Sequence, residues 1–189
     1  ILVAAGFESG DVKFWDLRDG NLRGSLAPLE GSVWAAQFSA DGNYLVTASD
    51  DGQAIVWEMM TYSRVKNLAH PTSVKAAAFS PDGRHVVTGD RASTVRLWDL
   101  DTGIPMEARG HRGTIHCVGF SPDGKLIASA GADRTTKLWR IGPNALEAVR
   151  TLEHDAAVYG VCFSPDGTKV ATASLDGMVR IWDARSGGL

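Results

Sequence analysis

The sequence predicts an all-β repeat protein, and two observations lead to that prediction. The turn sequence Ser-Ala-Asp-Gly at 39–42 recurs as Ser-Pro-Asp-Gly at 80–83, 121–124 and 164–167, so the spacings are 41, 41 and 43 residues. Five of the six tryptophans keep the same step, with spacings of 42, 41, 41 and 43 residues; they are Trp15, Trp57, Trp98, Trp139 and Trp182. A period of this length, with short apolar runs between turns, is typical of the four-stranded antiparallel blade of a β-propeller.

Each repeat divides into four short strands. In the third full repeat they are expected at 115–121, 125–130, 135–141 and 147–153, because these runs are rich in branched and aromatic residues and are bounded by Gly, Pro and Asp. In the turn, serine suits the first position, proline presets φ at the second and glycine suits the fourth. The apolar residues Ile115, Val118 and Phe120 of the opening strand do not alternate, so we expect a β-bulge there.

Three sequence features carry a resemblance to a known family. Trp-Asp pairs stand at 15–16, 98–99 and 182–183, with looser versions at 57–58 and 139–140; a Gly-His pair stands at 110–111; and the Ser-Pro-Asp-Gly turns recur. With these features the chain resembles the WD-repeat (β-transducin-like) proteins along essentially its whole length. The resemblance implies a β-propeller that usually closes with seven blades and serves as a platform for other proteins.

On this reading, residues 1–189 are one propeller domain, present in part. Residues 1–28 give the end strands of one blade, 29–69, 70–110 and 111–153 are full repeats, and 154–189 begin a further blade. Eighteen expected strands make about four and a half blades, whereas seven blades of this repeat length need about 290 residues. We therefore expect these residues to belong to a larger ring.

Four polar positions recur in register with the tryptophan. The third and fourth full sets are complete, with His111, Ser129, Asp133 and Trp139 in one and His154, Thr172, Asp176 and Trp182 in the other. Two sets are incomplete: His70, Thr88 and Trp98 occur with Ala92 at the aspartate position, and Thr47, Asp51 and Trp57 occur with Leu29 at the histidine position. The resemblance implies that each set forms a hydrogen-bonded tetrad inside its blade, so the blade with Ala92 is expected to be the softest.

A catalytic triad is the alternative reading of Ser129, His111 and Asp133. An enzyme needs one nucleophile, but this set repeats, and threonine replaces serine at three of the four positions. No GxSxG sequence surrounds Ser129. We therefore predict a structural set and a protein that is not an enzyme.

The resemblance places partner contacts on the face around the central channel. The positions that usually lie there are Trp34, Lys75, His116 and Tyr159, and, before the tetrad aspartate, Asp50, Arg91, Ala132 and Leu175. Aromatic rings are common interface anchors, and Lys75 with Arg91 suits an acidic or phosphorylated motif. The alternatives are that the rings pack over neighbouring loops and that the charges are simply solvated.

A second motif, Trp-Asp-x-Arg, ends at Arg18 and at Arg185. It looks like the pattern found in substrate receptors of cullin–RING ubiquitin ligases, while the simpler reading is a local pairing at a strand end. The function expected is thus a non-catalytic scaffold or adaptor for protein or peptide partners. The alternatives are such a ligase receptor or a regulatory domain of a larger enzyme.

Composition excludes several other classes. Nineteen basic and twenty-two acidic residues give a net charge of −3 without a basic run, so no nucleic-acid partner is expected. Apolar runs are far too short for a membrane span, no signal peptide opens the chain, and no small-molecule substrate or cofactor is expected. The four histidines at 70, 85, 111 and 154 give no zinc pattern, and Cys117 and Cys162 suggest no disulfide framework, so an intracellular home, cytoplasmic or nuclear, is expected.

Overall fold

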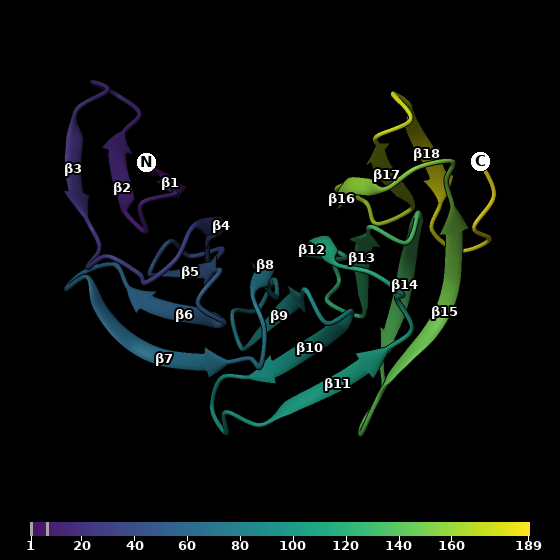
Figure 1. The fold of residues 1–189 in the computed structure, drawn as a ribbon, viewed down its shortest axis with the longest axis horizontal. Helices are drawn as coiled ribbons and strands as arrows, with labels where there is room; N and C mark the ends of the chain where they lie inside the picture. The colour runs from purple at the N-terminus through teal and green to yellow at the C-terminus, as the bar shows by residue number, and fades with distance from the viewer. Residues whose placement is uncertain (1, 7) are drawn as a thin grey trace.

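The computed structural model describes residues 2–6 and 8–189, with side chains from residue 8 onward. Every regular element in this part of the chain is a β-strand, and the strands form three four-stranded and two three-stranded antiparallel sheets. The predicted all-β class of four-stranded blades is confirmed. Figure 1 shows the five sheets following one another in an open arc, with the two chain ends at its tips.

We number these sheets blades I to V in chain order. Blade I contains β1 (Leu2–Gly6), β2 (Val12–Asp16) and β3 (Leu22–Ser25). Blade II contains β4 (Val33–Phe38), β5 (Tyr44–Ser49), β6 (Gln53–Glu58) and β7 (Ser63–Ala69). Blade III contains β8 (Val74–Phe79), β9 (His85–Asp90), β10 (Thr94–Asp99) and β11 (Pro105–Arg109). Blade IV contains β12 (Ile115–Phe120), β13 (Leu126–Gly131), β14 (Thr135–Ile141) and β15 (Leu146–Glu153), and blade V contains β16 (Val158–Phe163), β17 (Lys169–Ser174) and β18 (Val179–Asp183).

Each blade is a meander in which consecutive strands pair. The first strands of blades II to V, namely β4, β8, β12 and β16, lie on the concave side of the arc (Figure 1), and β4 contacts β8, β8 contacts β12 and β12 contacts β16. The last strands, β7, β11 and β15, lie on the outside (Figure 1). The arc is therefore held together at its inner edge, and the ends of the strands open onto its two faces.

The repeated Ser-x-Asp-Gly turn joins the first and second strands of blades II to V. The glycine amide donates to the serine carbonyl in all four turns, and the glycines Gly42, Gly83, Gly124 and Gly167 have φ between 70° and 74°. The serine hydroxyl donates to the aspartate two residues later at 2.5–2.7 Å. Because a positive φ favours glycine and the two side chains lock the turn, this tetrapeptide recurs wherever the fold needs it.

The apolar core lies between the blades. Val46, Val56 and Leu68 of blade II pack with Val74 and Trp98 of blade III, and equivalent clusters join blades I and II, III and IV, and IV and V. In blades II to V the tryptophan is buried in the interface with the preceding blade. The regular spacing of the tryptophans therefore marks one interface residue per blade.

A β-bulge interrupts the first strand of blades II to V. The register shifts between Val33 and Ala35, and at the equivalent places in β8, β12 and β16. The predicted bulge beside Ile115 is confirmed. The extra residue in each strand is the one after the first apolar position, and a bulge re-aims the side chain at that point. These four residues are Trp34, Lys75, His116 and Tyr159.

Candidate functional site

Blade IV contains a continuous chain of hydrogen bonds that runs through Ser129. The Trp139 indole donates to Ser129 Oγ at 2.8 Å, and Ser129 Oγ lies 2.7 Å from His111 Nε2. His111 Nδ1 lies 3.0 Å from both carboxylate oxygens of Asp133. The chain links β13, β14, the loop that leads from blade III into blade IV and the loop between β13 and β14, so it ties both loops to the sheet.

This arrangement keeps the Ser129 hydroxyl away from solvent and engaged with two side chains. Ser129 is fully buried, and its hydroxyl both accepts from Trp139 and donates to His111. Burial lowers the pKa of His111, although the hydrogen bond and charge of Asp133 act to raise it. A neutral imidazole with Nδ1 protonated satisfies every partner in this chain, as buried polar groups require.

Blade V departs from the expected tetrad. Trp182 donates to Thr172 Oγ1 at 2.9 Å and His154 Nε2 lies 2.8 Å from the same oxygen, as in blade IV. His154 Nδ1, however, lies 3.1 Å from the carbonyl oxygen of Leu152, and Asp176 is held by Arg180 at 2.7 Å. The expected contact between His154 and Asp176 is therefore wrong.

Two neighbouring positions explain why blades IV and V differ. Blade IV has Gly131 where blade V has Ser174, and a Cβ on Gly131 would lie 2.9 Å from His111 Nδ1 and 3.0 Å from Asp133 Oδ1. With a Cβ at position 131, His111 or Asp133 would have to shift. Two residues before the tryptophan, blade IV has Lys137, which bonds Thr151, whereas blade V has Arg180, which binds the aspartate in its own blade.

Blade III replaces the aspartate contact by a buried ion pair. His70 Nε2 lies 2.8 Å from Thr88 Oγ1, and His70 Nδ1 lies 2.8 Å from the carbonyl oxygen of Leu68. Position 92 is alanine, but the buried Asp90 pairs with the buried Arg96, which also donates to Glu107 at 2.8 Å. Burial and the charge of Arg96 lower the pKa of His70 to about 4.

Blade II has no histidine in this place. Trp57 donates to Thr47 Oγ1 at 2.9 Å, and Leu29 packs in the same core as Trp57. Asp51 accepts instead from the Ser49 hydroxyl and from the Gln53 amide. The tryptophan–hydroxyl bond is thus common to blades II to V, while the partners around it vary.

The bulge residues of blades II and III form one linked group. The Lys75 ammonium lies 3.8 Å from the centroid of the Trp34 ring and 2.5 Å from Asp50 Oδ1, which also accepts from the Ser73 hydroxyl. Burial raises the pKa of Asp50, but the hydrogen bonds of Lys75, Ser73 and Trp34 outweigh it and hold that pKa at about 2. Trp34 is nevertheless 55% exposed, so its ring remains available on the surface.

The bulge residues of blades IV and V form a second pair. The rings of His116 and Tyr159 stack with centroids 4.3 Å apart and planes 16° from parallel. Burial, followed by the charge of Lys75, lowers the pKa of His116, so this ring is neutral near pH 7. Tyr159 remains 54% exposed.

These two groups border one open pocket of about 370 Å³. Its lining consists of Trp34, Lys75, Arg91, Thr114, His116 and Tyr159, which come from four successive blades. Five of the six predicted partner-binding residues thus line one hollow, and the sixth, Asp50, holds Lys75 at its side. Ala132 and Leu175 are exposed but are not part of the lining.

The sequence reasoning missed two hydroxyl residues at this pocket. Thr114 lines it, and Ser73 fixes Asp50. Both stand directly before the first apolar residue of an inner strand, where blade II has Ser32. That recurrence of a hydroxyl was the available signal.

The two Trp-Asp-x-Arg motifs make local contacts. The Arg18 amide donates to Asp16 Oδ1 at 2.9 Å, and the Arg185 amide donates to Asp183 Oδ1 at 3.1 Å. Asp16 also pairs with Arg23 at 3.1 Å. In both motifs, the aspartate therefore closes the turn that follows its strand.

Among the described residues, no three His, Cys, Asp or Glu side chains gather where they could hold a metal ion. The same part of the chain has no helix long and apolar enough to span a bilayer. Cys117 and Cys162 are free thiols, the first partly buried and the second exposed.

A propeller-type arc with a tryptophan–hydroxyl bond in successive blades defines a class of repeat protein, and comparison with known families gives its name. The family model described as WD domain, G-beta repeat matches residues 20–58, 62–99, 105–140 and 146–183. These matches cover most of the chain. The chain therefore belongs to the WD-repeat family.

Curated proteins with similar stretches are also WD-repeat or related proteins. The F-box-like/WD repeat-containing protein TBL1X of Mus musculus is 33% identical over 60 residues, which is 32% of this chain and 11% of that protein. Pre-mRNA-processing factor 19 of Schizosaccharomyces pombe is 30% identical over 74 residues, 39% of this chain and 15% of its own length. Periodic tryptophan protein 2 of Arabidopsis thaliana is 32% identical over 71 residues, 38% of this chain and 8% of that protein. The chain thus matches only a small part of each relative.

Proposed function

We propose that this chain is a non-catalytic platform that docks protein or peptide partners on the face of the arc bearing Trp34 and Tyr159. The supporting observation is the open pocket of about 370 Å³ between these two rings. Exposed aromatic side chains beside a hollow are the usual anchors of protein interfaces. Membership of the WD-repeat family agrees with this role, since such propellers are typically interaction scaffolds.

The pocket offers two kinds of contact to a partner. Trp34 and the stacked His116–Tyr159 pair give apolar walls that are already fixed by Lys75 and by each other. Arg91 is exposed at the same pocket and supplies a positive charge. Because the walls are held in place before a partner arrives, little side-chain entropy is lost on binding.

The proposal includes an intracellular setting and protein partners rather than nucleic acid. Two free thiols and no disulfide among the described residues suit a reducing compartment. Nineteen basic residues against twenty-two acidic ones, without a basic run, do not suit a phosphate backbone.

Quantitative affinity purification from cells tests the proposed docking face. We expect the variant Trp34→Ala/Tyr159→Ala to lose a defined subset of the partners that the wild-type protein retains. Met60→Ala is the matched control, because Met60 is an apolar side chain that is 90% exposed and does not line this pocket. A partner list unchanged in the double variant, or reduced equally in the control, would contradict the proposal.

A further inference from the structure

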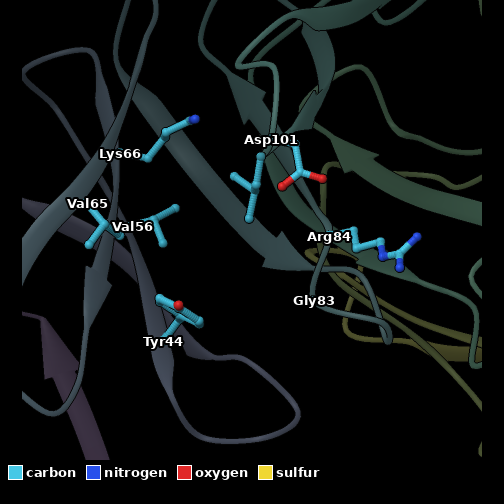
Figure 2. Close-up of a pocket in the computed structure, with 8 residues that line it drawn as sticks. Tyr44, Val56, Val65, Lys66, Gly83, Arg84 and Asp101 are labelled. Carbon is cyan, nitrogen blue, oxygen red and sulfur yellow. The ribbon is translucent and has the colours of Figure 1, made fainter.

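A second pocket lies at the opposite ends of the strands, between blades II and III. It has a volume of about 300 Å³, and Figure 2 shows the residues around it. Tyr44 starts β5 and lines this pocket, whereas Asp50 directly follows the other end of β5 beside the Trp34 pocket. The two pockets therefore belong to different faces of the arc.

The floor and walls of this pocket are apolar. Val56 is 2% exposed and forms part of the core between blades II and III, with Leu100 packed against the same core. Val65 and Tyr44 are 47% and 38% exposed and stand beside Val56 in Figure 2. Exposed apolar side chains around a buried apolar floor lose water when another aliphatic side chain fills the space.

The turn of blade II leaves the pocket between blades II and III more open than the turns of blades III and IV leave the equivalent places. In the turns of blades III and IV, the prolines Pro81 and Pro122 reach to 3.8 Å and 3.5 Å from where a Cβ would stand on Gly124 and Gly167 of the next turn. The turn of blade II has Ala40 in that position, and a Cβ on Gly83 would meet nothing within 4 Å. The substitution of alanine for proline thus uncovers Gly83, which lines the pocket.

Positive charge dominates the edge of the pocket. Lys66 and Arg84 line it, and neither forms a salt bridge in the described part of the chain. Lys66 extends from β7 across the blade interface, since its Cε lies 3.7 Å from where a Cβ would stand on Gly103. Asp101 is the one acidic residue of the lining, and it makes no salt bridge to either cation.

The equivalent place between blades III and IV has the opposite charge. It is smaller, about 190 Å³, and has Leu97 and Ile141 in the positions of Val56 and Leu100. Its lining contains Asp82 and Asp123 and has no lysine or arginine. The fold therefore repeats the apolar floor from blade to blade, while only the first of these two sites surrounds it with cations.

We propose that the pocket between blades II and III binds an aliphatic side chain of a partner protein segment whose flanking residues are aspartate and glutamate. The aliphatic group covers Val56 and Tyr44, and the flanking carboxylates meet Lys66 and Arg84. Two cations that form no salt bridge among the described residues, at the edge of an apolar hollow with one carboxylate in its lining, favour such a segment over a basic one. This surface is independent of the docking face that bears Trp34.

Fluorescence anisotropy with labelled synthetic peptides tests the proposal on the full chain. The probe is a heptapeptide with leucines flanked by glutamate and aspartate; two comparison peptides replace the leucines by alanine or the acids by lysine. We expect the acidic leucine peptide to bind more tightly than both. We also expect Lys66→Glu/Arg84→Glu to weaken its binding at least about tenfold, because reversed charges repel the carboxylates.

Two control variants make the result specific. Lys125→Glu changes the residue equivalent to Arg84 in the next turn, whose side chain is 81% exposed, and should leave binding unchanged. Trp34→Ala should also leave binding of the acidic leucine peptide unchanged. The peptide experiment therefore tests the pocket between blades II and III separately from the docking face that bears Trp34. Tighter binding of the lysine peptide, equal binding of the alanine peptide, or the same loss in Lys125→Glu would overturn the proposal.

Discussion

At the scale of single residues, Gly131 decides whether a histidine can reach its aspartate. The contact between His111 and Asp133 occupies the space that a Cβ at position 131 would need. We expect Gly131→Ala to lower the free energy of unfolding by about 1–3 kcal/mol, through overpacking against His111. Chemical denaturation of the full chain gives this value.

A double-mutant cycle separates this steric effect from a general cost of removing a strand glycine. The Asp133→Ala background removes the carboxylate oxygen at 3.0 Å and the group that holds His111 Nδ1 in place, so the imidazole can move aside and Gly131→Ala should cost clearly less there. Gly119→Ala is the matched control, because Gly119 also lies in a strand of blade IV and a Cβ there meets nothing within 4 Å. Equal costs in both backgrounds would mean that the contact does not depend on Gly131.

Residue types at the tetrad positions were predictable from the sequence, but some of their partners were not. The period places a tryptophan and a hydroxyl ten residues apart, and the structure joins them in blades II to V. The partner of the histidine Nδ1 atom depends on which other side chains bind the aspartate of the same blade. Arg180 takes Asp176, and His154 then uses the nearest backbone carbonyl. The outcome depends on the positions of the side chains in three dimensions, and the spacing of residues along the sequence does not give those positions.

At the scale of the blade, Asp90 and Arg96 form the feature that sets blade III apart. Both side chains are buried, and Arg96 also holds Glu107 at the outer strand β11. Because position 92 is alanine, the sequence predicts that blade III is the softest blade. In the structure, the ion pair of Asp90 and Arg96, together with Glu107, links the three strands β9, β10 and β11 of this blade. Its strength depends on both members being present, since an unpaired buried charge is costly.

Removing the arginine alone should therefore destabilise this blade strongly. We expect Arg96→Met to lower the free energy of unfolding by about 3–5 kcal/mol, because Asp90 is left buried without its counter-ion. The double variant Asp90→Ala/Arg96→Met should recover part of that loss. Denaturant melts measure both, and a double variant no more stable than Arg96→Met would show that the charge of Asp90 is not the cause.

Strands, turns and bulges follow from local sequence, which explains why they were predictable. The Ser-x-Asp-Gly turn contains its own hydrogen bonds, and the broken alternation in β12 signals its bulge without reference to other blades. The Trp34 pocket could not be predicted from local sequence alone. The bulge positions could be named in advance, but the stacking of His116 on Tyr159 depends on the angle between blades IV and V.

At the scale of the whole molecule, the blades share their cores, so the stability of each depends on its neighbours. Buried clusters join blades I and II, II and III, III and IV, and IV and V. Each interface also contains the tryptophan of the later blade, with its indole bonded to a hydroxyl in the sheet. The arc thus resembles other repeat architectures, in which nearest-neighbour interfaces dominate stability.

These interfaces also make the stability of the whole arc depend on pH. Burial lowers the pKa of His70 to about 4 and lowers the pKa of His111 and of His154. An unfolded histidine has a pKa of about 6.5, so between about pH 6.5 and 4 the unfolded chain binds protons that the folded chain does not. The free energy of unfolding must then fall as the pH drops through this window.

Thermal melts at about pH 7.5, 6.5, 5.5 and 5.0 test this dependence above the range in which most carboxylates titrate. We expect the melting temperature to be constant above about pH 7 and to fall steadily below about pH 6.5, with the three histidines contributing together. His70→Gln should flatten part of the slope, because glutamine does not titrate in this window and can still accept from or donate to Thr88. A melting temperature that stays level down to about pH 5 would mean that these imidazoles are protonated as easily in the folded arc as in the unfolded chain.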